Sequence, residues 1–153
     1  MDPVTQQALT QAGAFAAIGF AAVGSALGAG VAGCAAVGAW KKCYAQDRPA
    51  PFQLAVFAGA PLSQTIYGMI LMFLISAKAA EAASQWPVFL VLGTLAGIAM
   101  GVSAWMQGKA AAGASDAFAE TGEGFTNYLI VLGIIETVAL FIMVFTLMLV
   151  QGA

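Results

Sequence analysis

The sequence contains no histidine among its 153 residues, and only 8% of its residues are charged. The lack of histidine removes the commonest metal ligand and acid–base side chain. The net charge of −2 and the absence of a dense Lys/Arg cluster argue against nucleic acid or other polyanions as partners. The two cysteines are too few for a disulfide framework and, without histidine, form a poor metal site.

Apolar residues make up 61% of the chain, which is more than a soluble domain of this length can bury. Polar or turn-forming clusters occur at residues 41–51, 78–87 and 116–124. Four apolar segments remain, at residues 8–39, 52–77, 88–114 and 125–150. Each is long enough for the ~20 residues with which a helix crosses a bilayer. The sequence therefore predicts an all-α membrane protein, in which four transmembrane helices form a single membrane domain over residues 1–153.

The two halves of the chain are similar in pattern. The first and third segments are rich in Gly and Ala, whereas the second and fourth are rich in Leu, Ile, Met and Phe. Residues 25–30 and 103–108 align with Ser, Ala and Gly at equivalent positions, which indicates a parallel duplication of one helical hairpin. We place hairpin 1 at about residues 8–79 and hairpin 2 at about residues 86–151.

Glycines recur at four-residue spacing in the first and third segments, and this spacing allows helix backbones to approach closely. They are Gly24, Gly28, Gly93, Gly97 and Gly101. For any one pair, packing inside a four-helix bundle is the simpler interpretation. Over the whole of both segments, the abundance of small residues favours a crowded inner ring built from many copies.

Basic residues are unevenly distributed over the loops. Lys41, Lys42 and Arg48 lie in the first loop and Lys109 lies near the third, against Lys78 alone in the second. The positive-inside rule therefore places loops one and three in the cytoplasm and both termini outside.

Glu136 lies in the middle of the fourth apolar segment. A charged side chain at this depth costs at least about 2.5 kcal/mol, and such residues usually mark an ion or proton pathway. Counted from the cytoplasmic loops, Gln64, Gln107 and Glu136 lie 9 to 13 residues into their segments. At the rise of an α-helix, they share a depth of roughly 14 to 20 Å. The sequence predicts that three helices bring polar side chains to one level.

The second segment carries a polar stripe at that level. The spacing i, i+3, i+4 and i+7 places Ala60, Ser63, Gln64 and Tyr67 on one helix face. Pro61 disturbs the turn before it and frees a backbone carbonyl. The predicted oxygens come from the Glu136 carboxylate, the Gln64 and Gln107 amides, the Ser63 hydroxyl and one carbonyl. About five hard oxygens with one negative charge suit Na⁺, although either glutamine taken alone is equally well explained by an interhelical hydrogen bond.

Three motifs resemble one family: PLSQTIYG at residues 61–68, QGKAAAG at 107–113 and IET at 135–137. They resemble the rotor-ring proteolipid, the K or c-type subunit, of V-type ATPases, and especially its bacterial sodium-translocating form. The resemblance covers all four segments. It implies a homo-oligomeric ring of about ten copies in lipid, turning against a stator a/I-type subunit and joined by central-stalk subunits to a soluble ATP-hydrolysing head. The implied location is the bacterial plasma membrane.

The resemblance also implies a role for each site residue. Glu136 is the ion-binding carboxylate, and one Na⁺ is carried per subunit. Gln64 and Gln107 supply amide oxygens, and Ser63 supplies a hydroxyl where the family has threonine. Ala60 stands where the family offers a backbone carbonyl, and Tyr67 donates a hydrogen bond to Glu136.

Only hairpin 2 carries an acid at this depth, because hairpin 1 has Leu62 and Ser63 at the corresponding level. One ion per duplicated subunit favours pumping against a steep gradient over ATP synthesis. The chain has no phosphate loop and no candidate nucleophile, so we expect a non-catalytic subunit.

Three other interpretations stay open at this point. A proton-translocating rotor subunit needs only a protonatable Glu136 and does not need Gln64 or Gln107. A small secondary transporter predicts inverted repeats and a cavity that contacts a substrate. A passive structural bundle predicts a stable isolated monomer and no ring of many copies.

Overall fold

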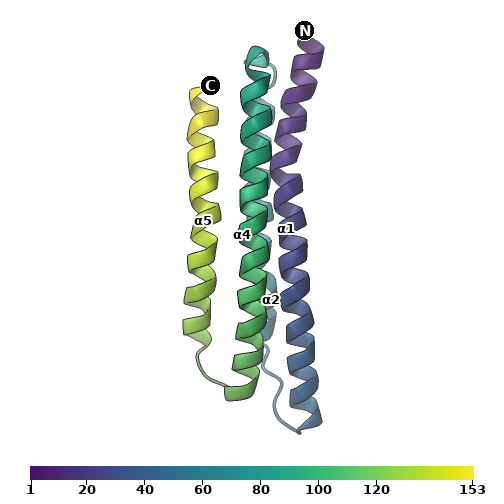
Figure 1. The fold of residues 1–153 in the computed structure, drawn as a ribbon, viewed down its shortest axis with the longest axis vertical. Coiled ribbons are helices and arrows are strands. Elements are labelled where there is room, and N and C mark those ends of the chain that lie inside the picture. Colours follow the sequence, from purple (N-terminus) through teal and green to yellow (C-terminus); the bar gives the residue numbers. More distant parts are fainter.

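The computed structural model describes all 153 residues, and its regular structure is entirely helical. Four helical spans run side by side, with both termini at one end of the bundle (Figure 1). The first span is α1 (Pro3–Ala45), and the second is interrupted and consists of α2 (Leu54–Gly59), η1 (Ala60–Leu62) and α3 (Ser63–Lys78). The third is α4 (Trp86–Thr121), preceded by the short η2 (Ala83–Gln85), and the fourth is α5 (Phe125–Gly152). By length and composition all four suffice to cross a membrane, so the predicted four-span all-α fold is confirmed.

Two of the predicted breaks begin too early. α1 continues to Ala45 and α4 continues to Thr121, so the polar clusters at 41–51 and 116–124 are partly helical. Charge does not end a helix that has left the hydrocarbon layer, because Lys and Glu are good helix formers in water. The helices end where the backbone turns left-handed, at Asp47 with φ 50° and at Gly122 with φ 72°.

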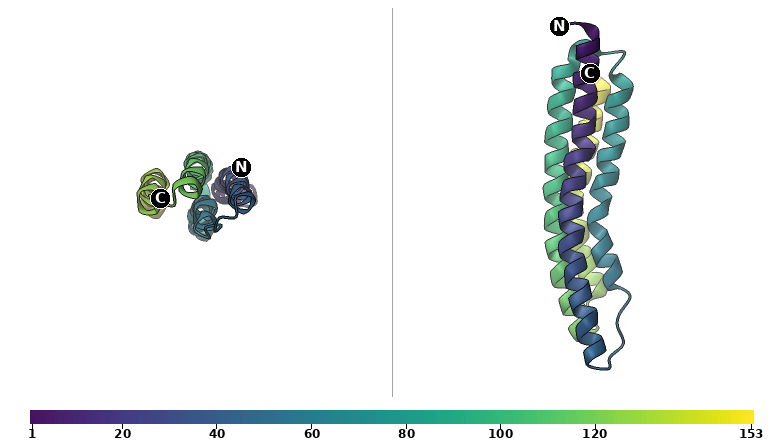
Figure 2. Two further views of the ribbon diagram at one scale, coloured as in Figure 1. Left: turned by 90° about the horizontal axis from the view of Figure 1, so that it is seen from below. Right: turned by 90° about the vertical axis from the view of Figure 1, so that its right-hand side faces the viewer.

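The most extensive helix contact in the bundle joins α1 and α4, the two spans rich in small residues. α5 lies at the edge of the bundle, against α4 and α3, as the end view in Figure 2 shows. A Cβ atom added at Gly24 would overlap the backbone of Gly101, and one added at Gly93 would overlap the backbone of Gly13. Close packing inside the bundle is therefore confirmed for these glycines, and a further role in an inner ring stays a prediction.

Gly28 packs against two neighbouring elements, α4 and η1. A Cβ atom there would overlap the Ala104 carbonyl of α4 and would lie 2.9 Å from the ring of Pro61 in η1. The missing side chain thus lets α1 touch both neighbours at once. This contact brings the interrupted span close to α4 at the level of the predicted polar residues.

Apolar side chains form three buried layers along the bundle. The layer at the loop end includes Phe57 and Phe118, whose rings meet edge to face at 6.2 Å between centroids. The middle layer includes Leu71 and Met100, and the layer near the termini includes Phe89. A polar group between two of these layers therefore has apolar side chains on both sides along the bundle axis.

The loop end of the bundle is tied together by polar contacts. The Arg48 guanidinium donates to the carbonyls of Ala119 and Glu120 at 3.1 Å each, at the end of α4. Lys42 pairs with the Glu120 carboxylate at 3.6 Å, and the exposed position of both groups makes this pair weak. The first loop is therefore fastened to hairpin 2 mainly by the carbonyl contacts of Arg48.

The glycine junction generates a test of the helix packing. We expect Gly24→Ala to lower the free energy of unfolding by about 1–3 kcal/mol, because the added methyl meets rigid backbone of α4. Gly30→Ala in the same helix is the matched control, since its Cβ would meet no atom within 4 Å. Thermal unfolding of both variants in detergent measures the difference. Equal stability of the two variants would contradict the backbone contact.

Candidate ion-binding site

Two fully buried amides connect α3 to α4. The Gln64 Nε2 group donates to the Gln107 Oε1 atom at 2.9 Å, and both side chains are 0% exposed. A buried amide without partners is costly, so this pair fixes the relative position of the two helices. The contact is the interhelical hydrogen bond expected for either glutamine taken singly.

Glu136 joins this pair from α5. Its Oε2 atom accepts from the Gln107 Nε2 group at 3.3 Å, and its Oε1 atom accepts from the Tyr67 hydroxyl at 2.6 Å. Both carboxylate oxygens are thus held by side chains from two other helices. The short distance to Tyr67 is typical of a hydroxyl that donates to a charged oxygen.

The interruption at Pro61 positions the remaining predicted groups. Pro61 has no N–H, and the chain adopts a 3₁₀ turn over Ala60–Leu62 before α3 begins. The Ala60 carbonyl is not left without a donor, contrary to expectation, because it accepts from the Ser63 backbone N–H and lies 3.2 Å from the Ser63 hydroxyl. A carbonyl has two lone pairs, so it can also face an ion when that hydroxyl turns away. The same hydroxyl lies 3.2 Å from the Gln64 Oε1 atom. A hydroxyl has one proton, so it serves only one of these acceptors fully at a time.

All six residues singled out in the sequence therefore meet in one hydrogen-bonded network. It runs from the Ala60 carbonyl through Ser63, Gln64 and Gln107 to Glu136 and Tyr67. The predicted common depth of three helices is confirmed by these contacts. Each of the five oxygens predicted as ligands lies within one hydrogen bond of another group in the network.

Two contacts of the site were not predicted. The Gln107 Nε2 group also donates to the Leu132 carbonyl at 3.0 Å, and the Ser103 hydroxyl donates to the Ile135 carbonyl at 2.9 Å. Backbone carbonyls carry no signal in a sequence, which explains the miss for Leu132 and Ile135. Ser103 is four residues before Gln107 and so lies on the same helix face, a signal that the sequence did contain.

The network lies between two apolar layers. Leu132 belongs to the layer at the loop end and Ala139 belongs to the middle layer, and Glu136 lies between them in α5. No basic side chain pairs with Glu136, because the only ion pair in the chain is Lys42 with Glu120. Lys109 lies two residues beyond Gln107, but its Nζ atom is 4.1 Å from the ring centroid of Trp105. A negative charge on Glu136 is therefore neutralised by no group of this chain.

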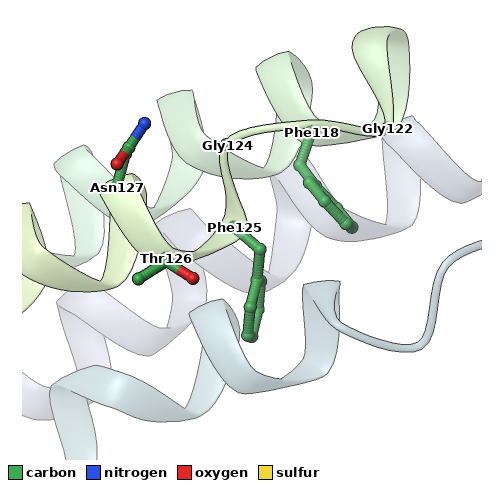
Figure 3. A pocket seen from close by; sticks show the side chains of 6 residues that line it. All are labelled: Phe118, Gly122, Gly124, Phe125, Thr126 and Asn127. Atoms are coloured by element: carbon green, nitrogen blue, oxygen red, sulfur yellow. The ribbon is translucent and has the colours of Figure 1, made fainter.

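The hollows of the surface lie away from this network. The hollow drawn in Figure 3 lies at the turn between α4 and α5, where the rings of Phe118 and Phe125 lie side by side below Gly124. Two others lie on the outer faces of α1 and α4. None of the six site residues lines any of the three. Gln64 and Gln107 are fully buried, whereas Glu136, Tyr67 and Ser63 are half-buried. A network without a hollow suits a small cation or a proton better than an organic substrate.

The chemistry of the site follows from its donor set. One carboxylate, two amide oxygens, a hydroxyl and a carbonyl are hard, weakly polarisable ligands that prefer cations such as Na⁺. The chain has no cluster of three His, Cys, Asp or Glu side chains that would hold a transition metal. A single carboxylate also gives a neutral site when it is protonated or when it holds one monovalent cation.

The comparison with known families concerns hairpin 2. Residues 90–149 match the model for the c-subunit family of ATP synthase. The matched residues include Gln107 and Glu136 and span most of α4 and α5. No curated protein matches the chain at a significant level.

The match supports a rotor-ring proteolipid. Together with the four apolar spans it indicates an integral membrane protein. The matched c-subunit family indicates an ion-translocating rotor subunit, and the members of that family are non-catalytic. Members of this family form homo-oligomeric rings that work with a stator a subunit.

The Tyr67 contact generates a test of the network. We expect Tyr67→Phe to increase the rate of carbodiimide labelling at Glu136 by about threefold, the factor for one interhelical hydrogen bond, because one carboxylate oxygen loses its donor. Tyr44→Phe is the matched control, since Tyr44 is 69% exposed and lies far along the chain from the site. Mass spectrometry of the labelled chain measures both rates. Equal rates in both variants would show that the Tyr67 bond does not restrain Glu136.

Proposed function

We propose that this chain is the duplicated rotor subunit of a V-type ATPase and carries one Na⁺ per copy at Glu136. The Glu136 carboxylate supplies the charge. The amide oxygens of Gln64 and Gln107, the hydroxyl of Ser63 and the carbonyl of Ala60 complete the coordination. Tyr67 holds the carboxylate in place, as its 2.6 Å hydrogen bond supports.

The observation that carries this proposal is the pair of fully buried amides beside the carboxylate. A proton carrier needs only Glu136 and does not require two amides. A Na⁺ carrier needs several hard oxygens to replace the water that the ion sheds. The hydrogen bonds support ligation, because they bring the Ser63 hydroxyl and both amides into one connected network with the Glu136 carboxylate.

Neutrality of the loaded site explains how the ion is carried. An unpaired carboxylate facing lipid is costly, whereas a carboxylate with bound Na⁺ has no net charge. A loaded copy can therefore pass through the lipid-facing part of a rotation. A cationic group of the stator lowers the affinity for Na⁺ when a copy reaches it, because like charges repel.

The duplication supports the V-type form of the subunit. The matched family unit spans one hairpin, residues 90–149, and hairpin 1 precedes it with the same direction of entry. Hairpin 1 has no acid at the level of Glu136. One ion per four helices favours steep-gradient pumping, and we propose a ring of about ten copies whose cytoplasmic loops meet central-stalk subunits.

The proposed orientation places loops one and three in the cytoplasm of a bacterial cell. Both loops lie at the end of the bundle opposite the termini (Figure 1), and Lys41, Lys42 and Arg48 lie there. The charge distribution follows the positive-inside rule. The termini then lie outside.

The decisive experiment is carbodiimide labelling of the purified ring near neutral pH. We expect Na⁺ to suppress labelling at Glu136, while choline at equal ionic strength does not, because only Na⁺ occupies the carboxylate. Mass spectrometry maps the modified residue. Labelling that responds to rising pH but not to Na⁺ would instead establish a proton carrier.

Variants of the amides sharpen this experiment. We expect Gln64→Leu to raise the Na⁺ concentration that halves labelling by at least about tenfold, the effect of losing a ligand worth about 1.4 kcal/mol. Gln7→Leu is the matched control, since Gln7 is exposed near the terminus and outside the network. Unchanged protection in Gln64→Leu would remove the amide from the ligand set.

A further inference from the structure

The Ser103 hydroxyl is the only hydroxyl of the chain that donates to a backbone carbonyl of another helix. It is 5% exposed and donates to the Ile135 carbonyl of α5 at 2.9 Å. The other hydroxyls that donate to a helical carbonyl use a residue three or four positions earlier in their own span: Thr10, Ser63, Thr94, Ser115, Thr121 and Thr137. Such local bonds are the usual choice for a hydroxyl in a membrane helix. Ser103 instead links two helices.

Few hydrogen bonds join α5 to the other helices. Of the four spans α5 is the least buried, since only 17% of the residues in its apolar 18-residue stretch are buried. One bond, from Gln85 to the Ala153 carbonyl, lies at the C-terminus. Three side chains of other helices donate the remaining hydrogen bonds to α5: Tyr67, Ser103 and Gln107. The bonds from these three side chains all end between Leu132 and Glu136. The axial position and rotation of α5 at the carboxylate are therefore set within a little more than one turn.

Only one of these bonds is independent of the ion-binding groups. Tyr67 donates to the carboxylate itself, and the Gln107 amide divides its donors between Glu136 and the Leu132 carbonyl. Both must adjust when a cation binds or leaves. The bond from Ser103 to Ile135 involves neither the carboxylate nor a proposed ligand, so binding or release of a cation does not require it to break. It ends one residue before Glu136.

Hairpin 1 provides an internal comparison. Ser25 aligns with Ser103 in the repeat and is 2% exposed, yet its Oγ atom has no hydrogen-bond partner. The span that follows Ser25 has no acid at the corresponding level. The same residue type at the same place in the repeat is thus bonded across helices only in the hairpin that carries the carboxylate.

We infer that Ser103 is a positioning residue, which holds α5 so that Glu136 meets its ligating partners whether or not the ion is bound. This inference rests on the proposed function for the role of Glu136. It predicts that loss of the hydroxyl changes the behaviour of the carboxylate, although Ser103 does not contact it. Loss of the Ser25 hydroxyl leaves that behaviour unchanged.

The test uses the purified ring with four variants: Ser103→Ala, Ser103→Cys, Ser103→Thr and Ser25→Ala. Two quantities are measured by mass spectrometry, the rate of carbodiimide labelling at Glu136 without Na⁺ and the Na⁺ concentration that halves this rate. We expect Ser103→Ala and the size-matched Ser103→Cys to change the Na⁺-free rate and to raise the halving concentration about threefold, the factor for one interhelical hydrogen bond. We expect Ser103→Thr, which keeps the hydroxyl, and Ser25→Ala to match the unaltered chain.

Three results would overturn the inference. The first is an assembled Ser103→Ala or Ser103→Cys ring that matches the unaltered chain in both quantities. The second is a Ser25→Ala ring that changes as much as Ser103→Ala, since the effect would then be one of general packing. The third is a Ser103→Thr ring that behaves like Ser103→Ala. If Na⁺ fails to slow labelling in the unaltered chain, the sodium proposal fails, and the Na⁺-free rates of the variants still decide the role of Ser103.

Discussion

The hydrogen bonding of one half-buried carboxylate in an apolar bundle is the constraint on which the rest of the structure depends. Glu136 lies between two apolar layers, where an unpartnered acid is costly. Its oxygens are held by Tyr67 of α3 and Gln107 of α4, and Gln107 is itself completed by Gln64. The least buried helix, α5, is thereby joined to the two helices beside it at the level where the ion is expected.

This polar network needs a close-packed support, which the small residues of α1 and α4 provide. Backbone meets backbone at Gly24 with Gly101, so the relative position of these helices is closely fixed. Gly28 extends this contact to Pro61, the residue that interrupts the second span. The interruption places the Ala60 carbonyl and the Ser63 hydroxyl beside Gln64. The packing of α1 against α4 and η1 thus helps to position the oxygens of Ala60, Ser63 and Gln64.

The two hairpins share a pattern and differ in chemistry. Hairpin 2 matches the family model over residues 90–149 and contains the acid, whereas hairpin 1 supplies Gln64, Ser63 and Tyr67 as partners. The pair Ser103 and Ser25 shows the same division, since only the serine near the acid bonds to a neighbouring helix. One hairpin is specialised to carry the charge and the other to complete its surroundings.

The sequence by itself determined the four spans and the common level of Gln64, Gln107 and Glu136, because span length and helical rise depend only on local spacing. The charged clusters predicted the ends of α1 and α4 too early, because a helix can continue beyond the boundary of the lipid. The family resemblance also implied the bond from Tyr67 to Glu136. Only the tertiary structure decided which helices are neighbours, how the two amides pair, and that Ser103 bonds the Ile135 carbonyl. These features depend on the rotation and pairing of helices, which arise from packing across the whole bundle and leave no local pattern in the chain.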